Sequence, residues 1–221
     1  MGVSQSALTK YIDHTNLKAT ATEEDIRKLC REAREYGFAS VCVNPVHTEL
    51  VHRELAGSSV MTCCVVGFPL GANDSRIKAA EAKLAVEAGA DEVDMVINLG
   101  AIKAGNRDEV RDDIAAVVKA AAGRTVKVII ETCYLEDKEK KAACECAKDA
   151  GAHFVKTSTG FGSGGATVED VKLMKSVVGD IMKVKASGGI RTLDDAVAMI
   201  EAGADRIGAS AGIAIVEAAR E

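Results

Sequence analysis

Aromatic residues are scarce in this sequence, and positive charge is not in excess. Phe, Trp and Tyr together make up 3% of its 221 residues, and the formal net charge at pH 7 is −5. Proteins that bind nucleic acid generally stack aromatic side chains on bases and contact phosphates with clustered basic side chains. We therefore expect no nucleic acid among the partners of this protein.

Long apolar segments are missing as well, and we expect no secretory leader. No apolar run approaches the roughly 18 residues needed to cross a bilayer, so we expect a soluble protein with no membrane partner. The seven cysteines are an odd number and are spread along the chain. Their distribution argues against a disulfide framework and favours a reducing, cytoplasmic location.

Two close cysteine pairs, Cys63-Cys64 and Cys144-Glu-Cys146, raise the question of a metal site. Adjacent residues of a strand point to opposite faces, and helix positions i and i+2 do not face each other. No histidine lies nearby to complete a zinc site. We expect packed thiols here and no metal.

One pattern occurs four times along the chain. An alanine- and charge-rich stretch ends in a glycine, and an apolar run begins within three residues; the glycines are Gly37, Gly89, Gly151 and Gly203. A glycine in this place is typical of the left-handed residue that follows the end of a helix. The repeat predicts helices that alternate with parallel strands.

Eight apolar runs are candidate strands, and amphipathic stretches such as 23–36 and 107–122 lie between most of them. The runs are Lys10–His14, Ser40–Asn44, Val60–Gly67, Glu92–Asn98, Val126–Thr132, His153–Ser158, Met182–Ser187 and Arg206–Ala209. Short, nearly continuous apolar strands that alternate with helices predict a parallel sheet covered on both faces.

Eight such units in a chain of this length predict an α/β fold of the closed (β/α)8, or TIM, barrel type. We expect one domain over residues 1–221, with a short N-terminal lead-in. An open, doubly wound sheet is the alternative. Against it, no Gly-x-Gly-x-x-Gly follows the first strand, where a dinucleotide site would have one.

Charged side chains occur at the ends of several candidate strands, where a barrel enzyme has its active site. Asp94 lies in strand four, Lys156 in strand six and Lys185 in strand seven. If their faces point inward, these three side chains converge inside the barrel. A structural salt bridge is the alternative role for Asp94. We expect Lys183 to lie below the site, and Lys127 to be an outward-facing or entry-end lysine.

Lys156 interrupts the apolar run that begins at His153. Burial of an unpaired ammonium is costly and lowers the pKa of a lysine, and a neutral amine is a nucleophile. Lys156 is therefore a candidate nucleophile. The alternative is that it is simply the first solvated residue beyond the strand.

Glycine-rich turns follow strands six, seven and eight. They are Thr159–Gly165, Ser187–Gly189 and Gly208–Ser210. Backbone N–H groups in such turns bind anions, and the loops after strands seven and eight of a barrel are a frequent phosphate site. Ordinary turn glycines are the alternative for any one loop. The three turns together predict a phosphate site.

Six segments, in order along most of the chain, carry a resemblance to a known family. They are Ile12-Asp-His-Thr-Asn-Leu17, Ser40-Val-Cys-Val-Asn-Pro45, Val66-Gly-Phe-Pro-Leu-Gly71, Asp91-Glu-Val-Asp-Met-Val96, Phe154-Val-Lys-Thr-Ser-Thr-Gly160 and Val184-Lys-Ala-Ser-Gly-Gly-Ile-Arg191. With these segments the chain resembles the deoxyribose-phosphate aldolases. The Lys-Thr-Ser-Thr-Gly and Lys-Ala-Ser-Gly-Gly blocks are specific in combination.

The resemblance implies a class I aldolase on a (β/α)8 barrel that reversibly joins acetaldehyde to glyceraldehyde 3-phosphate, giving 2-deoxy-D-ribose 5-phosphate. It implies that Lys156 forms the Schiff base and that Lys185 and Asp94 handle protons. No metal and no cofactor are implied, the partners are a phosphorylated sugar and small aldehydes, and we expect a homo-oligomer. The expected substrate-binding residues are Asp13, Thr15, Cys42, Thr157, Gly160, Ser187, Gly188, Gly189 and Ser210.

The chain departs from some relatives at two places. Phe161 stands where they have a basic residue that touches phosphate, so phosphate binding is expected to depend more on backbone amides. The sequence given ends at Glu221 without the tyrosine tail of some longer relatives, so we expect the assistance of that tyrosine in proton transfer to be absent or replaced.

Two other functions remain as alternatives. One is a different Schiff-base aldolase or a sugar-phosphate isomerase on the same barrel, and an isomerase would form no imine. The other is a sugar-phosphate sensor with a degenerate site, although Asp94, Lys156 and Lys185 are all present.

Overall fold

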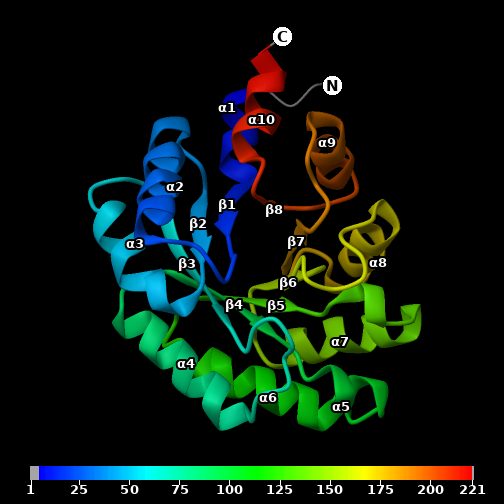
Figure 1. Ribbon diagram of the computed structural model, residues 1–221. Coiled ribbons are helices and arrows are strands. Elements are labelled where there is room, and N and C mark those ends of the chain that lie inside the picture. Colours follow the sequence, from blue (N-terminus) through cyan, green and yellow to red (C-terminus); the bar gives the residue numbers. More distant parts are fainter. Residues whose placement is uncertain (1–4, 221) are drawn as a thin grey trace.

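Eight parallel strands close into a barrel in the computed structural model, which describes residues 5–220. Each strand pairs with the next along the chain, and β1 pairs with β8 (Figure 1). The strands are β1 (Ile12–Asn16), β2 (Ser40–Val43), β3 (Met61–Val66), β4 (Glu92–Val96), β5 (Thr125–Ile129), β6 (Phe154–Lys156), β7 (Lys183–Ser187) and β8 (Arg206–Ala209). The (β/α)8 prediction is confirmed, and the closing β1–β8 pair rules out the open sheet.

All eight predicted strands are present, with ends that differ by a few residues. β1 begins at Ile12 rather than Lys10, because the short 3-10 helix η1 (Thr9–Tyr11) occupies the preceding residues. β6 ends at Lys156, whereas the prediction extended to Ser158. Residues 157–159 therefore belong to a loop at the mouth of the barrel.

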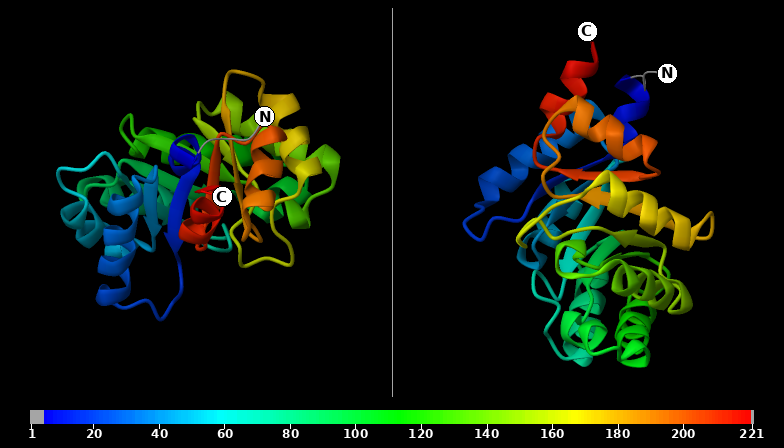
Figure 2. Two further views of the ribbon diagram at one scale, coloured as in Figure 1. Left: turned by 90° about the horizontal axis from the view of Figure 1, so that it is seen from above. Right: turned by 90° about the vertical axis from the view of Figure 1, so that its right-hand side faces the viewer.

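Helices surround the strands on the outside of the barrel (Figure 2). The predicted helix at 23–36 has the same bounds in the structure, and the one predicted at 107–122 ends at Ala120. The α-helices are α1 (Gln5–Leu8), α2 (Glu23–Tyr36), α3 (Thr48–Glu54), α4 (Ser75–Glu87), α5 (Leu99–Lys103), α6 (Arg107–Ala120), α7 (Asp137–Asp149), α8 (Val168–Val178), α9 (Leu193–Glu201) and α10 (Gly212–Glu217). Three further 3-10 helices are η2 (Pro45–His47), η3 (Thr132–Tyr134) and η4 (Ala218–Arg220). Within residues 5–220, none of these helices has the length and apolar character of a bilayer-crossing segment.

The ends of the helices follow the local sequence. Thr22 and Asp25 form a capping box at the start of α2, where the Thr22 side chain accepts a hydrogen bond from the Asp25 N–H. The four glycines of the repeat have φ angles of +65°, +96°, +78° and +110° at Gly37, Gly89, Gly151 and Gly203. These left-handed conformations are favourable only without a β-carbon, and they confirm the predicted helix-to-strand junctions.

The interior of the barrel differs chemically from the layer between strands and helices. Outward-facing strand residues such as Val41, Val93, Val128 and Val184 belong to the large apolar core under the helices. The alternate, inward-facing residues form only a small apolar cluster of Cys42, Cys63 and Val65. Most (β/α)8 barrels fill their interior with branched apolar side chains. Here much of that space holds charged groups.

The capping box of α2 gives a test of local stability. We expect Thr22→Ala to lower the free energy of unfolding by about 1 kcal/mol, because the N–H of Asp25 loses its acceptor. Urea unfolding followed by circular dichroism measures the change. Thr20→Ala, in the exposed turn two residues earlier, is the control and should change stability by less than about 0.5 kcal/mol. Equal effects in the two variants would contradict the role of the cap.

Candidate active site

Three carboxylates and four cations share the interior of the barrel. All are buried, and they come from six strands: Asp13 (β1), Glu92 and Asp94 (β4), Lys127 (β5), Lys156 (β6), Lys185 (β7) and Arg206 (β8). A buried charge is costly unless it is paired and hydrogen-bonded. Each of these groups accordingly lies within ion-pair distance of a group of opposite charge.

Asp94 is the centre of the upper part of this cluster. Its Oδ2 lies 2.9 Å from Lys156 Nζ and 2.7 Å from Lys185 Nζ. Its Oδ1 accepts from Lys127 Nζ at 2.9 Å and from Cys63 Sγ at 3.2 Å. The convergence of Asp94, Lys156 and Lys185 predicted from strand alternation is confirmed.

The charge state of Asp94 follows from these contacts. Burial raises the pKa of the carboxyl, but Lys127, Lys156 and Lys185 outweigh it and hold the pKa well below the usual range. Asp94 is therefore an ionised carboxylate at neutral pH. It balances several ammonium groups at once.

A second layer of ion pairs lies below the first. Lys185 Nζ is 2.5 Å from Asp13 Oδ2, and the Arg206 guanidinium donates to Asp13 and to Glu92. Burial raises the pKa of Asp13, and Lys185, Arg206 and Lys127 lower it more strongly. Asp13 thus lies behind Lys185 and supports it.

Lys127 is the clear error of the sequence interpretation. It was expected to face outward or to lie at the entry end, but its side chain is 0% exposed and points into the barrel. Its Nζ bonds Glu92 at 2.6 Å as well as Asp94. Lys127 is the third residue of β5, a position whose side chain faces the barrel interior, and it pairs in register with Asp94. Lys183 is the first residue of β7 and therefore lies below the site, as predicted, and its side chain is exposed.

Lys185 and Lys127 remain protonated in this cluster. Burial lowers the pKa of Lys185, but Asp13 and Asp94 outweigh it and raise the pKa above its ordinary value. The pKa of Lys127 is likewise raised, against burial, mainly by Asp94. Neither lysine is therefore suited to supply a neutral amine.

A hollow of about 440 Å³ opens above the cluster at the carboxyl ends of the strands. Lys156 lines it, whereas Lys127 and Lys185 are fully buried beneath. Seven of the predicted site residues line the hollow: Thr15, Lys156, Gly160, Ser187, Gly188, Gly189 and Ser210. Asp13, Cys42, Asp94, Thr157 and Lys185 are not part of its wall.

The loops that follow β6 and β7 are tied to each other. Thr157 Oγ1 donates to Ser187 O and accepts from Ser187 N, both at 3.1 Å, and Ser187 Oγ donates to Ser158 O at 2.6 Å. The two backbones are also in close contact. Gly165 lies so near Gly188 that a β-carbon on Gly165 would be only 2.2 Å from Gly188 O. Thr157 and Ser187 therefore fix the relative position of the two loops.

Two basic residues at the hollow were missed by the sequence interpretation. Lys18 in the loop after β1 and Arg191 in the loop after β7 both line it. The signal was present, since Arg191 directly follows the Gly-Gly-Ile turn. Phe161 is 57% exposed and packs edge-on against Phe68, with ring centroids 5.4 Å apart.

Cys42, a predicted site residue, is buried beside Cys63 under the hollow. A hydrogen bond with Cys63 lowers the pKa of Cys42, and burial raises the pKa of Cys63 well above its ordinary value. The two sulfurs and an Asp94 oxygen lie within 4.8 Å of one another, a spacing that fits a metal. Lys127 Nζ already contacts Cys63 at 3.4 Å and Asp94 at 2.9 Å, so a cation bound there would have to displace this ammonium.

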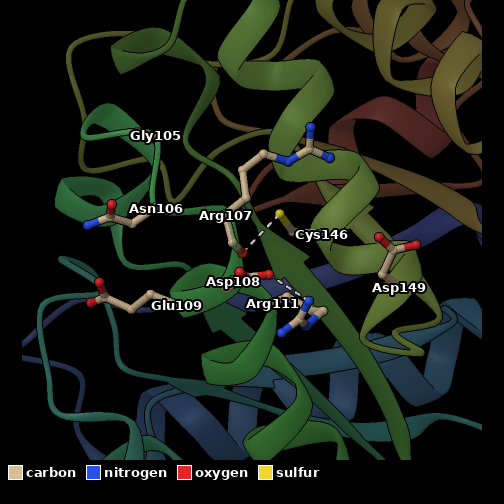
Figure 3. Close-up of a pocket in the computed structure, with 8 residues that line it drawn as sticks. All are labelled: Gly105, Asn106, Arg107, Asp108, Glu109, Arg111, Cys146 and Asp149. Carbon is tan, nitrogen blue, oxygen red and sulfur yellow. Dashed lines mark hydrogen bonds and ion pairs between the residues drawn. The ribbon is translucent and has the colours of Figure 1, made fainter.

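A second hollow, of about 700 Å³, lies on the outer surface between α6 and α7 (Figure 3). Its arginines already have partners: Arg107 pairs with Glu145 at 2.6 Å, and Arg111 pairs with Asp108 at 2.7 Å. The hollow at the barrel mouth, above the buried lysines, is therefore the candidate active site.

The fold and this site define a (β/α)8-barrel enzyme in which buried lysines surround one carboxylate at the floor of the hollow. Residues 7–218 match the model of the DeoC/LacD family of aldolases. The chain belongs to that family.

Curated relatives and solved structures agree with this membership. The deoxyribose-phosphate aldolase of Clostridium novyi is 64% identical over 211 residues, which cover 95% of this chain and 95% of that protein. That of Thermotoga maritima is 62% identical over 210 residues, 95% of this chain and 85% of that protein. The tetrameric deoxyribose phosphate aldolase of Aeropyrum pernix superimposes with a TM-score of 0.92 at 38% identity, covering 99% of this chain and 93% of that chain.

The buried carboxylates give a prediction about stability and pH. Asp13→Asn leaves Lys185 and Arg206 with less negative charge, so at pH 7 we expect a loss of about 3–5 kcal/mol of unfolding free energy. The pKa of Asp13 is lower in the folded than in the unfolded protein, where it is about 3.9. The ionised carboxylate therefore stabilises the wild type at any pH above that unfolded pKa, and this contribution is lost as the pH falls through the folded pKa.

The measurement is urea unfolding of both proteins from pH 7 to the lowest pH at which each folds. The difference between wild type and Asp13→Asn should narrow below about pH 4. Asp149→Asn, an exposed change on α7, is the control and should show neither effect. A difference that stays constant with pH would contradict the assignment.

Proposed function

We propose that this protein reversibly cleaves 2-deoxy-D-ribose 5-phosphate to glyceraldehyde 3-phosphate and acetaldehyde through a Schiff base on Lys156. One observation carries the assignment of the nucleophile. Of the three lysines that contact Asp94, Lys156 lines the hollow, while Lys127 and Lys185 are enclosed and held as cations by carboxylates. The aldolases to which the chain is similar support the choice of substrate.

The proposed reaction begins at the aldehyde carbon of the open-chain sugar. Lys156 Nζ adds to this carbon, and loss of water gives an iminium ion. Removal of the proton from the C3 hydroxyl then breaks the C2–C3 bond and releases glyceraldehyde 3-phosphate, with the electron pair taken up as an enamine. Protonation of C2 and hydrolysis of the imine release acetaldehyde and restore the amine.

Lys185 and Asp94 are the proposed proton-handling pair. Asp94 lies 2.9 Å from the Lys156 nitrogen and 2.7 Å from the Lys185 nitrogen, so it connects the reacting amine to a permanent cation. Lys185 lies beneath the hollow, so in this proposal its proton reaches the substrate by way of Asp94, and the Asp94 carboxylate stabilises the positive charge of the iminium. A water between the pair and the C3 hydroxyl completes the proposed relay.

The phosphate is proposed to bind at the loops after β6, β7 and β8. Gly188 and Gly189 line this part of the hollow with φ angles of +83° and +80°, and Ser210 lies on the next strand end. Arg191 and Lys18 supply positive charge near these backbone amides. They are proposed to replace the basic residue that some relatives have at the position of Phe161.

We also propose that the protein forms a homo-oligomer. The support is the Aeropyrum pernix relative, whose structure is described as tetrameric. Light scattering of the purified protein tests the proposal, and a mass close to the chain mass of 23.1 kDa would contradict it.

Borohydride trapping tests the Schiff base directly. Incubation with acetaldehyde and sodium borohydride should leave one reduced adduct, and peptide mapping should place it on Lys156. Lys156→Ala should gain no adduct and lose retro-aldol activity while remaining folded, because Lys127 and Lys185 still neutralise Asp94. Lys183→Ala, at the exposed start of β7, is the control and should trap normally. An adduct mainly on Lys185 would reverse the assigned roles.

Lys185→Leu and Asp94→Asn separate imine formation from proton transfer. Each should lower kcat by about 100-fold or more, since the proton relay has no substitute. Lys185→Leu should still trap acetaldehyde on Lys156, because the nucleophile remains at the hollow. Steady-state kinetics and trapping on the same preparations measure the two steps, with circular dichroism as the check of folding. Turnover within a few-fold of wild type would remove Lys185 from the mechanism.

A further inference from the structure

Glu131 has a backbone conformation that is costly for a residue with a β-carbon. It lies two residues beyond β5, with φ +53° and ψ +66°, in the left-handed region. Ala122 is the other non-glycine residue with positive φ among residues 5–220, and it follows the end of α6. Glu131, in contrast, is 2% exposed and lies next to the mouth of the barrel. Strain of this kind persists where the surroundings require it.

The strained conformation aims the Glu131 carboxylate at the loop that follows the nucleophile. Oε1 accepts a hydrogen bond from Thr159 N at 3.0 Å, and Oε2 accepts one from the Thr159 hydroxyl. The hydroxyl oxygen in turn accepts from Phe161 N at 3.0 Å. One buried carboxylate therefore holds Thr159 by two hydrogen bonds, and the Thr159 hydroxyl in turn holds Phe161, on the other side of Gly160.

The loop also packs tightly over Glu131. A β-carbon on Gly162 would lie 3.2 Å from the Glu131 carboxyl carbon and 2.9 Å from Cys133 Sγ. Thr159, Gly160 and Phe161 form part of the wall of the hollow, whereas Glu131 lies behind them. The carboxylate can thus act on a ligand only through the loop.

Lys156 is held by a different set of bonds. Its carbonyl accepts from Ile130 N at 3.0 Å, and the following N–H, of Thr157, donates to Lys185 O at 3.0 Å. The Lys156 side chain is fixed by Asp94. The nucleophile is therefore held by main-chain bonds, one of them to the residue before Glu131, and by Asp94, and none of these bonds involves the Glu131 carboxylate.

From this separation we propose that Glu131 is a positioning residue for the phosphate end of the substrate. Its carboxylate holds Thr159–Phe161 in the conformation in which the Gly160 backbone faces the hollow, opposite Gly188 and Gly189. This inference deepens the proposed function and rests on it. In this proposal Glu131 contributes to recognition of the substrate phosphate, away from the Schiff base, and takes no part in the chemical steps.

A carboxylate suits this position better than an amide does. Both of its oxygens accept hydrogen bonds, and both partners in the loop, an N–H and an O–H, donate. Glutamine would offer one acceptor and turn an N–H₂ group toward one of these donors. Hydrogen bonds to a charged acceptor are also about twice as strong as neutral ones.

Glu131→Gln is the principal test, measured on deoxyribose 5-phosphate and on unphosphorylated deoxyribose. KM for the phosphorylated sugar should rise about tenfold or more, as expected for the loss of one charge-assisted hydrogen bond. The kinetics of the unphosphorylated sugar should change by less than about twofold, and trapping of acetaldehyde on Lys156 should match wild type. Competitive inhibition by inorganic phosphate should weaken in parallel with KM.

Two companion variants separate the carboxylate from the backbone strain. Glu131→Gly relieves the left-handed conformation but lacks the carboxylate, so it should show the same KM effect while folding at least as well as Glu131→Gln. Glu87→Gln, an exposed change of the same type on α4, should behave as wild type. A Glu131→Gly variant with normal KM would show that the carboxylate is not needed and would overturn the proposal.

Other outcomes contradict the proposal in recognisable ways. Equal losses on both sugars, or a lower kcat at unchanged KM, would place Glu131 in the support of the reacting centre. A lower KM for the phosphorylated sugar would mean that the carboxylate mainly repels the anion. Absence of trapping in the wild type itself would instead defeat the proposed Schiff-base function, so the two failures are distinguishable.

Discussion

The ion pairs inside the barrel are the constraint on which the rest of the site depends. Seven ionisable groups are buried inside the barrel, and each is tolerable only because a group of opposite charge lies against it. Asp94 contacts three lysines at once. The position and charge of every member therefore depend on its neighbours, and the cluster behaves as one unit.

The two layers of this cluster differ in their partners and in their distance from the hollow. Arg206, Glu92 and Asp13 form the lower layer, and its two carboxylates neutralise Lys127 and Lys185 from below as well as Arg206. Asp94 lies above these pairs and holds the amine of Lys156 at the floor of the hollow. Lys156 can lie at the end of its strand, next to the hollow, because ion pairs on the neighbouring strands compensate the charges beneath it.

The sequence predicted the barrel well, because each helix-to-strand junction carries its own local signal in a glycine and an apolar run. It also predicted the convergence of Asp94, Lys156 and Lys185, which follows from strand alternation. It misplaced Lys127, since alternation does not give the height of a residue in a barrel of tilted strands. Asp94 pairs in register with Lys127, Lys127 with Phe154, and Phe154 with Lys183, yet Lys127 is enclosed and Lys183 is exposed. The positions of Lys18 and Glu131 depend on tertiary contacts that no local pattern encodes, whereas Arg191 directly follows a glycine-rich turn that the sequence does show.

The interior cluster has a consequence for the electric field of the whole molecule. With all seven groups ionised, the cluster carries one formal positive charge, although the chain has a net charge of −5. The exterior is therefore more acidic than the total suggests, so an anionic ligand that approaches from a distance meets a net charge of its own sign. Dissolved ions screen distant exposed charges more than buried ones. Moderate ionic strength should consequently speed the arrival of an anionic ligand, the opposite of ordinary electrostatic steering.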